Sequence, residues 1–273
     1  LILKNLYHFL TKFWGNSTKS VILVIQLLVG KNMRLKFIVC KAIQREAYYC
    51  ASRSTNIVDV IITPQGLHNE PDKLRSSIQE EVNQTVDIQG NTYDAILLGY
   101  GLCSNGIADI KAPAIPLVVA RGHDCITLLL GSKELYKSYF DTHRGIYWYS
   151  IGWIENSLQP GKERYEKTLQ QYKEKYGEDN AEYLMQMEQN WFKEYSWATF
   201  INWGLIDSEK YRKYTKECAN YLKWNYDELK GDTLLLQKIV DGKWDDNLFL
   251  IVKPGEKIVP DVNSSDIIKA VAV

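Results

Sequence analysis

Three of the five cysteines stand where their thiols could share one ligand. Cys40 and Cys125 follow short apolar segments by one to a few residues, and Cys103 lies in a glycine-rich turn after a third such segment. Thiolates bind soft metals. Three of them could hold zinc, with a histidine or water as fourth ligand, or an iron–sulfur cluster with one iron open to substrate. The pattern therefore predicts a metal centre, with an iron–sulfur cluster as first choice.

Polar residues beside these cysteines could take part in the same site. His123 could bind a metal or act as a base, and Arg121 offers a positive charge for a carboxylate or phosphate, so we assign both a catalytic role. His68 follows another apolar segment and could join the site or cap a loop. The turn around Cys103 could bring backbone N–H groups close to an anionic cluster, and its candidate cofactor-binding residues are Gly99, Gly101, Ser104, Asn105 and Gly106.

The other two cysteines are expected to have a packing role. Cys50 and Cys218 lie on apolar stripes at helical spacing, where a thiol behaves as a small hydrophobic group. Five irregularly spaced cysteines are too few for a disulfide scaffold in a chain of 273 residues. We therefore expect reduced thiols and a cytoplasmic protein.

The elements that must position the three thiols are short apolar segments that alternate with amphipathic ones. Continuous apolar runs are typical of strands buried on both faces, and here they cover residues 35–39, 57–62, 95–98 and 115–120. This alternation predicts an α/β fold with a mostly parallel sheet and flanking helices. Because the carboxyl ends of parallel strands share one edge, the three thiols should converge there.

The second half of the chain has a different composition. Aromatic and charged residues dominate after residue 131, and amphipathic segments predict a helical insertion over residues 160–230. Two late strands, 233–240 and 247–252, are expected to rejoin the sheet, followed by a short helix near Ser265–Ala270. Residues 33–273 would then form a single α/β domain. Trp148 and Trp153 could pack in its core or wall a pocket for a planar or apolar ligand.

The first residues have a separate interpretation. Residues 1–32 precede Met33, the first methionine, and we interpret them as a non-native or disordered extension. A signal peptide or membrane anchor is the competing interpretation. The apolar run Val21–Val29 is interrupted by Gln26 and is much shorter than the roughly 20 residues of a membrane-spanning helix, which favours the extension.

Composition and missing motifs limit the function classes. The chain has 33 basic and 33 acidic residues, so it has no electrostatic footprint for nucleic acid or for an anionic membrane, and we expect neither as a partner. The balance favours a small molecule or another protein. The sequence also lacks the motifs of dinucleotide enzymes, P-loop NTPases, serine hydrolases and zincins.

The cysteine-bearing segments resemble a known family. Its motifs are similar to Cys40, the stretch Gly66–His68, the glycine turn 99–106 and the segment 121–132. The family is an uncharacterised one of methanogenic archaea and anaerobic bacteria, often encoded near corrinoid proteins and their methyltransferases. The resemblance covers residue 34 to the end, with Ser104 in place of an expected glycine and Arg144-Gly145 in place of Pro-Gly. It implies an anaerobic context and a corrinoid or methyltransferase protein as partner.

Three function classes remain open. The first is a metalloprotein that acts as a redox partner, or as a methyl- or thiol-handling enzyme, in corrinoid-linked metabolism. The second is a metal-free enzyme in which Cys103 or Cys125 is a nucleophile activated by His123. The third is a non-catalytic binding protein that uses its aromatic helical part as an interface.

Overall fold

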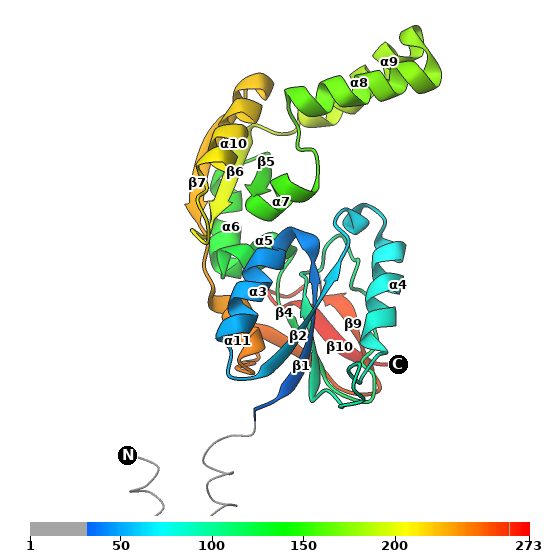
Figure 1. Cartoon of the computed structure of the whole chain (residues 1–273), viewed down its shortest axis with the longest axis vertical. Coiled ribbons are helices and arrows are strands. Elements are labelled where there is room, and N and C mark those ends of the chain that lie inside the picture. Colours follow the sequence, from blue (N-terminus) through cyan, green and yellow to red (C-terminus); the bar gives the residue numbers. More distant parts are fainter. Residues whose placement is uncertain (1–31, 262) are drawn as a thin grey trace, which may run out of the picture. The chain divides into compact units, whose positions relative to one another are not determined.

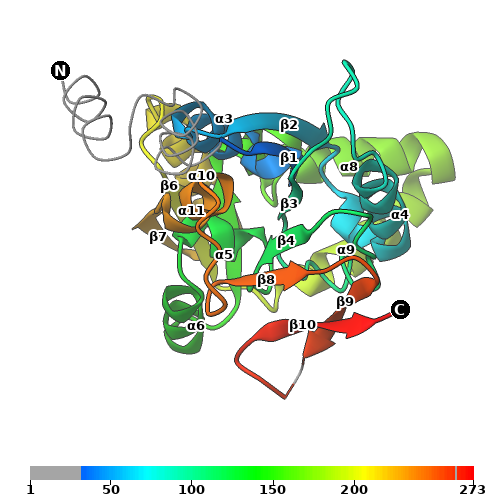
Figure 2. The same ribbon diagram turned by 90° about the horizontal axis from the view of Figure 1, so that it is seen from below.

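A five-stranded sheet forms the centre of this computed structural model, which describes residues 32–261 and 263–273 (Figures 1 and 2). Its first four strands are parallel, and its last strand is antiparallel to its neighbour. In spatial order the strands are β2 (Ile57–Thr63), β1 (Arg34–Cys40), β3 (Ala95–Gly99), β4 (Leu117–Ala120) and β8 (Phe249–Val252). The predicted α/β fold class is confirmed, and β1, β3 and β4 are neighbours.

Helices cover both faces of this sheet. Helix α4 (Pro71–Val82) packs on one face through Leu74 and Ile78, together with the hairpin of β9 (Glu256–Asp261) and β10 (Ile267–Ala272). Helices α3 (Gln44–Arg53) and α11 (Leu234–Val240) lie on the other face (Figure 1). Residues in β1, β3 and β4 are consequently almost all buried, which explains why these strands are continuous apolar runs.

A second parallel sheet follows in the chain. It has three strands in the order β5 (Ile146–Ser150), β6 (Trp197–Asn202) and β7 (Asn225–Lys230). Helix α10 (Glu209–Leu222) packs against it, and helices α8 (Lys162–Tyr176) and α9 (Glu178–Phe192) form a projecting hairpin (Figure 1). The predicted insertion therefore contains three helices, but it also contains β6 and β7, which the sequence did not predict.

Two late elements differ from the sequence prediction. The expected strand 233–240 is helix α11, because Leu235, Leu236, Ile239 and Val240 are all buried, and this spacing gives one helix face. The expected helix near Ser265–Ala270 is strand β10 (Ile267–Ala272), which pairs with β9 (Glu256–Asp261) in an antiparallel hairpin. Short apolar runs do not distinguish the two structures, so neighbouring elements decide.

The remaining elements are short; α5 (Cys125–Leu130) and α6 (Lys133–Thr142) lie between the two sheets in the chain, and α7 (Ile151–Asn156) follows β5. Helices α5 and α7 begin at capped positions, because the side chains of Asp124 and Ser150 accept hydrogen bonds from backbone N–H groups in the first turn. These elements are η1 (Lys41–Ile43), η2 (Leu67–Asn69), α5 (Cys125–Leu130), α6 (Lys133–Thr142) and α7 (Ile151–Asn156).

Residues Arg34–Val273 form one compact unit. The predicted extension over residues 1–32 falls almost entirely on residues 1–31, which lie outside the described residues. Among the helices that are described, none is both long enough and apolar enough to span a membrane.

Candidate functional site

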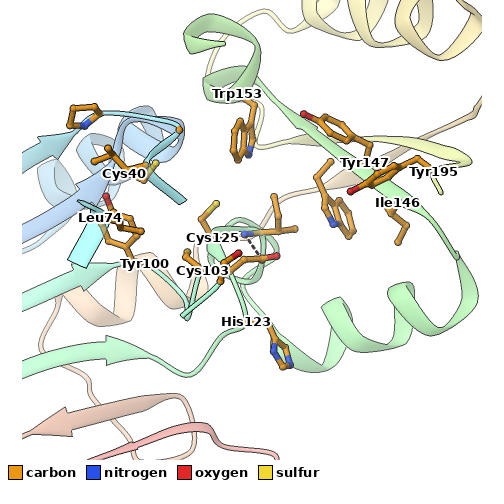
Figure 3. A pocket seen from close by; sticks show the side chains of 17 residues that line it. Cys40, Leu74, Tyr100, Cys103, His123, Cys125, Ile146, Tyr147, Trp153 and Tyr195 are labelled. Carbon is orange, nitrogen blue, oxygen red and sulfur yellow. Dashed lines mark hydrogen bonds between the residues drawn. The ribbon is translucent and has the colours of Figure 1, made fainter. Parts of the chain in front are cut away.

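The carboxyl ends of β1, β3 and β4 open into a cavity of about 350 Å³ (Figure 3). Cys40 is the last residue of β1, Cys103 lies in the turn after β3, and Cys125 is the first residue of α5 after β4. All three line this cavity, and their side chains lie around the same space (Figure 3). The topology therefore brings together three thiols that are far apart in the sequence.

Backbone contacts hold the Cys103 and Cys125 loops against each other. The N–H of Leu102 donates to the carbonyl of Gly122, and the N–H of Cys103 donates to the carbonyl of His123, both at 2.8 Å. Gly101 allows this approach, because a Cβ atom there would lie 2.5–2.7 Å from the backbone of Asp124. The glycine in this turn serves close packing of two loops.

The turn that carries Cys103 has an unusual backbone. Cys103, Ser104 and Asn105 follow one another with φ values of 47°, 55° and 66°, all in the left-handed region. Only glycine and, to a lesser degree, asparagine adopt this region without strain. Strained backbone of this kind concentrates at functional sites, where the surrounding structure maintains it.

The five predicted cofactor-binding residues do not all reach the cavity. Ser104 belongs to its lining, whereas the other four do not. Gly99 and Gly106 pack tightly against the side chains of Val39 and Leu74. The carbonyl of Asn105 accepts a hydrogen bond from Arg75 at 3.2 Å. Their positions support a role in shaping the turn, and direct contact with a cofactor stays a prediction.

The electrostatic environment keeps the three thiols protonated in the absence of a cation. Burial raises the pKa of Cys40, Cys103 and Cys125, and the negative charge of neighbouring thiolates raises the pKa of Cys103 and Cys125 further. Backbone N–H donors act in the opposite direction and lower the pKa of Cys40 and Cys103. The N–H of Ala42 faces the Cys40 sulfur, and those of Gly101 and Cys125 face the Cys103 sulfur.

The spacing of the thiols bears on which metal they could hold. Within the described residues, no three His, Cys, Asp or Glu side chains are grouped tightly enough to hold a metal ion as they stand. Sulfur ligands around one tetrahedral zinc lie only about 3.8 Å apart, given Zn–S bonds of about 2.3 Å. A cluster of several irons has thiolate ligands that are farther apart, because each thiolate binds a different metal atom. The donor type therefore fits either metal, and the choice between zinc and a cluster stays a prediction.

The predicted catalytic residues occupy different places. His123 lies at the edge of the cavity, but its ring points away from the three thiols (Figure 3). Arg121 does not line the cavity, since its guanidinium donates to the carbonyls of Asp246 at 2.8 Å and Ile268 at 2.6 Å. His68 lies in η2, and its side chain is outside the described part of the structure. The geometry brings neither the ring of His123 nor the guanidinium of Arg121 to the thiols.

The cavity lining also contains Asp124, a carboxylate beside Cys125 that the sequence marks as able to join the site but for which it predicts no specific role. Asp124 caps α5, with its Oδ1 accepting from the N–H of Ile126 at 3.0 Å and its Oδ2 accepting from the hydroxyl of Tyr136 at 3.0 Å. Burial raises the pKa of Asp124, while these hydrogen bonds act in the opposite direction. An aspartate directly before an apolar helix is an N-cap signal that could have predicted its capping role.

Aromatic side chains form the wall of the cavity away from Cys103 and Tyr100 (Figure 3). Trp148 and Trp153, which the sequence analysis singled out, both line it, and Tyr147 and Tyr195 join them. They come from β5, from α7 and from the segment before β6. No sequence signal marked the two tyrosines, because their position depends on how the second sheet packs.

The two remaining cysteines lie elsewhere. Cys50 is buried in α3 and Cys218 is buried in α10, and neither lines the cavity between the thiols and the aromatic wall. Burial raises the pKa of Cys50 to about 12 and that of Cys218 to about 11. Both positions agree with the expected packing role.

Fold and cavity together define a mixed α/β protein with a thiol-lined site at the carboxyl edge of its main sheet. Residues 62–240 match the model of the family described as a protein of unknown function, DUF1638, and the chain belongs to this family. The match includes Cys103 and Cys125 and begins after Cys40. No curated protein and no solved structure matches the chain. An uncharacterised family is thus confirmed, and its anaerobic context stays a prediction.

Proposed function

We propose that this chain is a cytoplasmic metalloprotein in which Cys40, Cys103 and Cys125 hold an iron–sulfur cluster. The observation that carries the proposal is that three buried thiols, from the ends of three parallel strands, line one cavity. Thiolates are the ligands that such clusters use, and a cluster bound by three of them keeps one iron open.

The protonation of the thiols supports a metal centre over a lone nucleophile. A nucleophilic cysteine needs a lowered pKa or an adjacent base, and burial here raises the pKa of all three thiols. The ring of His123, the expected base, points away from them (Figure 3). A bound metal removes this difficulty, because it deprotonates a coordinating thiol outright.

Backbone donors around the sulfurs support a cluster. N–H groups of Ala42, Gly101 and Cys125 face the sulfurs of Cys40 and Cys103, and hydrogen bonds to sulfur tune the potential of a cluster. When bound, such a cluster would supply either electron transfer or an open iron as a Lewis acid. The aromatic wall would border its substrate.

The metabolic setting is a further part of the proposal. Resemblance to the anaerobic family supports a role in corrinoid or methyl-transfer metabolism, as a redox partner or as a methyl- or thiol-handling enzyme. The partner would then be a corrinoid or methyltransferase protein, or a small molecule. An anaerobic setting also suits a cluster with an exposed iron, which oxygen would damage.

Metal analysis of anaerobically purified full chain tests this proposal. We expect a brown protein that contains iron and acid-labile sulfide. Cys40→Ser, Cys103→Ser and Cys125→Ser should each remove most of the iron, because a hard, protonated hydroxyl replaces a soft thiolate. Cys50→Ser and Cys218→Ser are matched controls that should keep the iron while losing about 1–3 kcal/mol of stability.

Two outcomes would contradict the cluster. Stoichiometric zinc without iron or sulfide would replace it by a zinc site that uses the same thiols. A colourless protein that stays metal-free after anaerobic reconstitution, with one thiol that reacts much faster than the others, would support the nucleophile instead. Full iron retention in any of the three variants would remove that cysteine from the site.

A further inference from the structure

The charge of the cavity lining limits the ligands that can bind beside the thiols. Asp124 is its carboxylate, and no lysine or arginine is among the described residues that line it. Thiolate ligands of a metal would add further negative charge. Away from the thiols, an anionic ligand such as a phosphate or carboxylate would find no lysine or arginine in the described lining, and His123 lies only at the cavity edge, so its burial is unfavourable.

The aromatic wall offers a different kind of attraction. Tyr147, Trp153 and Tyr195 line the cavity on the side away from Cys103, and Trp148 also belongs to its lining. The faces of aromatic rings carry partial negative charge, and they attract cations that shed their water easily. Both the carboxylate and the rings thus favour a positively charged ligand with an apolar surface.

Rings packed behind this wall hold it in place. The ring of Tyr147 lies 5.6 Å from that of Tyr195 and 6.0 Å from that of Trp224. The ring of Trp148 lies 5.9 Å from that of Tyr136 and 5.5 Å from that of Tyr139. A wall that is already ordered loses little conformational entropy when a ligand binds.

The size of the cavity limits the ligand to a small molecule. Its volume of about 350 Å³ lies at the lower end of the range for ligand pockets, which is roughly 300–1,000 Å³. A nucleotide would fill this cavity completely, and a tetrapyrrole would be too large for it. A compact organic cation leaves room for a metal centre beside it.

We propose that the aromatic wall is a subsite for a small organic cation of the quaternary ammonium class. Trp148, whose neighbour Tyr136 donates to Asp124, would contact its methyl groups, and Asp124 would supply the negative charge that balances it. The inference goes beyond the metal centre, because it rests on the charge and the aromatic lining of the cavity and not on a bound metal.

Three ligands of nearly the same shape test this subsite. Choline is the cation, 3,3-dimethylbutanol is its neutral carbon analogue, and 3,3-dimethylbutanoate is an anion of similar size. Binding to the full chain is measured by calorimetry and tryptophan fluorescence, with and without reconstituted iron. We expect choline to bind about tenfold more tightly than the alcohol, and the anion to bind most weakly.

Two variants separate the charge of the site from its shape. Asp124→Asn keeps a side chain that can cap the helix. It should lower the affinity for choline about fivefold or more, while the affinity for the alcohol stays within about twofold. Trp148→Leu should act in the same direction. Tyr183→Leu, at a site 63% exposed on α9, is the control and should change neither affinity.

The subsite is overturned if choline does not bind saturably, or if the alcohol or the anion binds as tightly as choline. It is also overturned if folded Asp124→Asn protein binds choline with unchanged affinity. Binding is measured with and without iron. If the chain binds no iron, the choline result still tests the subsite, and if choline does not bind, the iron analysis still tests the metal centre.

Discussion

The two parallel sheets contribute to one site in different ways. In the five-stranded sheet β1, β3 and β4 are almost wholly buried, and the cysteines stand at or just beyond their carboxyl ends, as Cys40 and Cys125 do. In the three-stranded sheet one strand, β5, itself carries cavity residues, and β7 is only half-buried along most of its length. One sheet holds the thiols at its edge, and the other provides a wall of rings.

The two sheets also differ in how a nearby glutamate is held. Glu46, on α3 beside the main sheet, is 3% exposed, and its Oε2 has no hydrogen-bond partner among the described residues. Glu228, on β7, accepts hydrogen bonds from Arg212 at 2.6 and 2.9 Å. The main sheet tolerates an unpaired acid, whereas the second sheet pairs its acid with an arginine.

The largest effect is expected from Glu46→Gln. Burial raises the pKa of Glu46 from 4.5 to about 7, so between these values the unfolded chain ionises while the folded chain stays protonated. Stability should therefore fall as the pH rises from about 4.5 to about 7, by on the order of 3 kcal/mol. Glu46→Gln should abolish this fall, as measured by urea unfolding at pH 5 and pH 8.

Glu228→Gln tests a pH dependence of stability that has the opposite sign. Hydrogen bonds from Arg212 lower the pKa of Glu228 from 4.5 to about 2, so its contribution is present above pH 4.5. It should be lost as the pH falls from about 4.5 towards 2, and Glu228→Gln should remove that acid dependence. Equal pH profiles for the two variants would contradict the distinction between the sheets.

A smaller effect is expected from Gly101→Ala. The new Cβ would lie 2.5 Å from the backbone nitrogen of Asp124, so the loops must separate and their two hydrogen bonds weaken. We expect a loss of about 1–3 kcal/mol in the free energy of unfolding, together with loss of most bound iron. Urea unfolding and iron analysis measure the two effects.

Gly177→Ala, between α8 and α9, is the matched control for this substitution. Its φ is +81° and its Cβ would meet nothing within 4 Å, so only backbone strain of about 1 kcal/mol is expected. Iron should stay bound. If Gly101→Ala also kept its iron, the close approach of the two loops would not matter for the thiol site.

The same contrast between the sheets explains how much could be predicted from the sequence. Buried strands such as 95–98 are apolar runs that indicate a parallel sheet, and the sheet predicts where the cysteines after its strands lie. Strand β7 (Asn225–Lys230) mixes polar and apolar residues, so only its pairing with β6 defines it. The aromatic wall that depends on this second sheet was correspondingly only half predicted.

Long-range contacts also decided the place of Arg121. Its position near His123 suggested an anion site, but its guanidinium donates to carbonyls of Asp246 and Ile268, more than a hundred residues later in the chain. No local pattern indicates such a partner. Local sequence therefore located the thiols, and tertiary packing decided which other polar residues reach them.

The smallest effect concerns strained backbone in the two regions. Lys223 ends α10 with φ 60°, and Ser104 stands in the Cys103 turn with φ 55°. Glycine relieves left-handed strain, so Lys223→Gly should raise the free energy of unfolding by about 0.5–1 kcal/mol. Ser104→Gly should stabilise the fold by a similar or smaller amount.

Metal retention distinguishes the two substitutions. A glycine at position 104 frees a turn that now presents Cys103 and Ser104 to the cavity, so Ser104→Gly should release iron faster to a chelator. Lys223→Gly lies on a helix end away from the thiols and should release iron at the rate of the parent chain. If Ser104→Gly gained stability without faster iron release, the strained turn would be a feature of the fold alone, and the comparison between the two regions would lose its functional meaning.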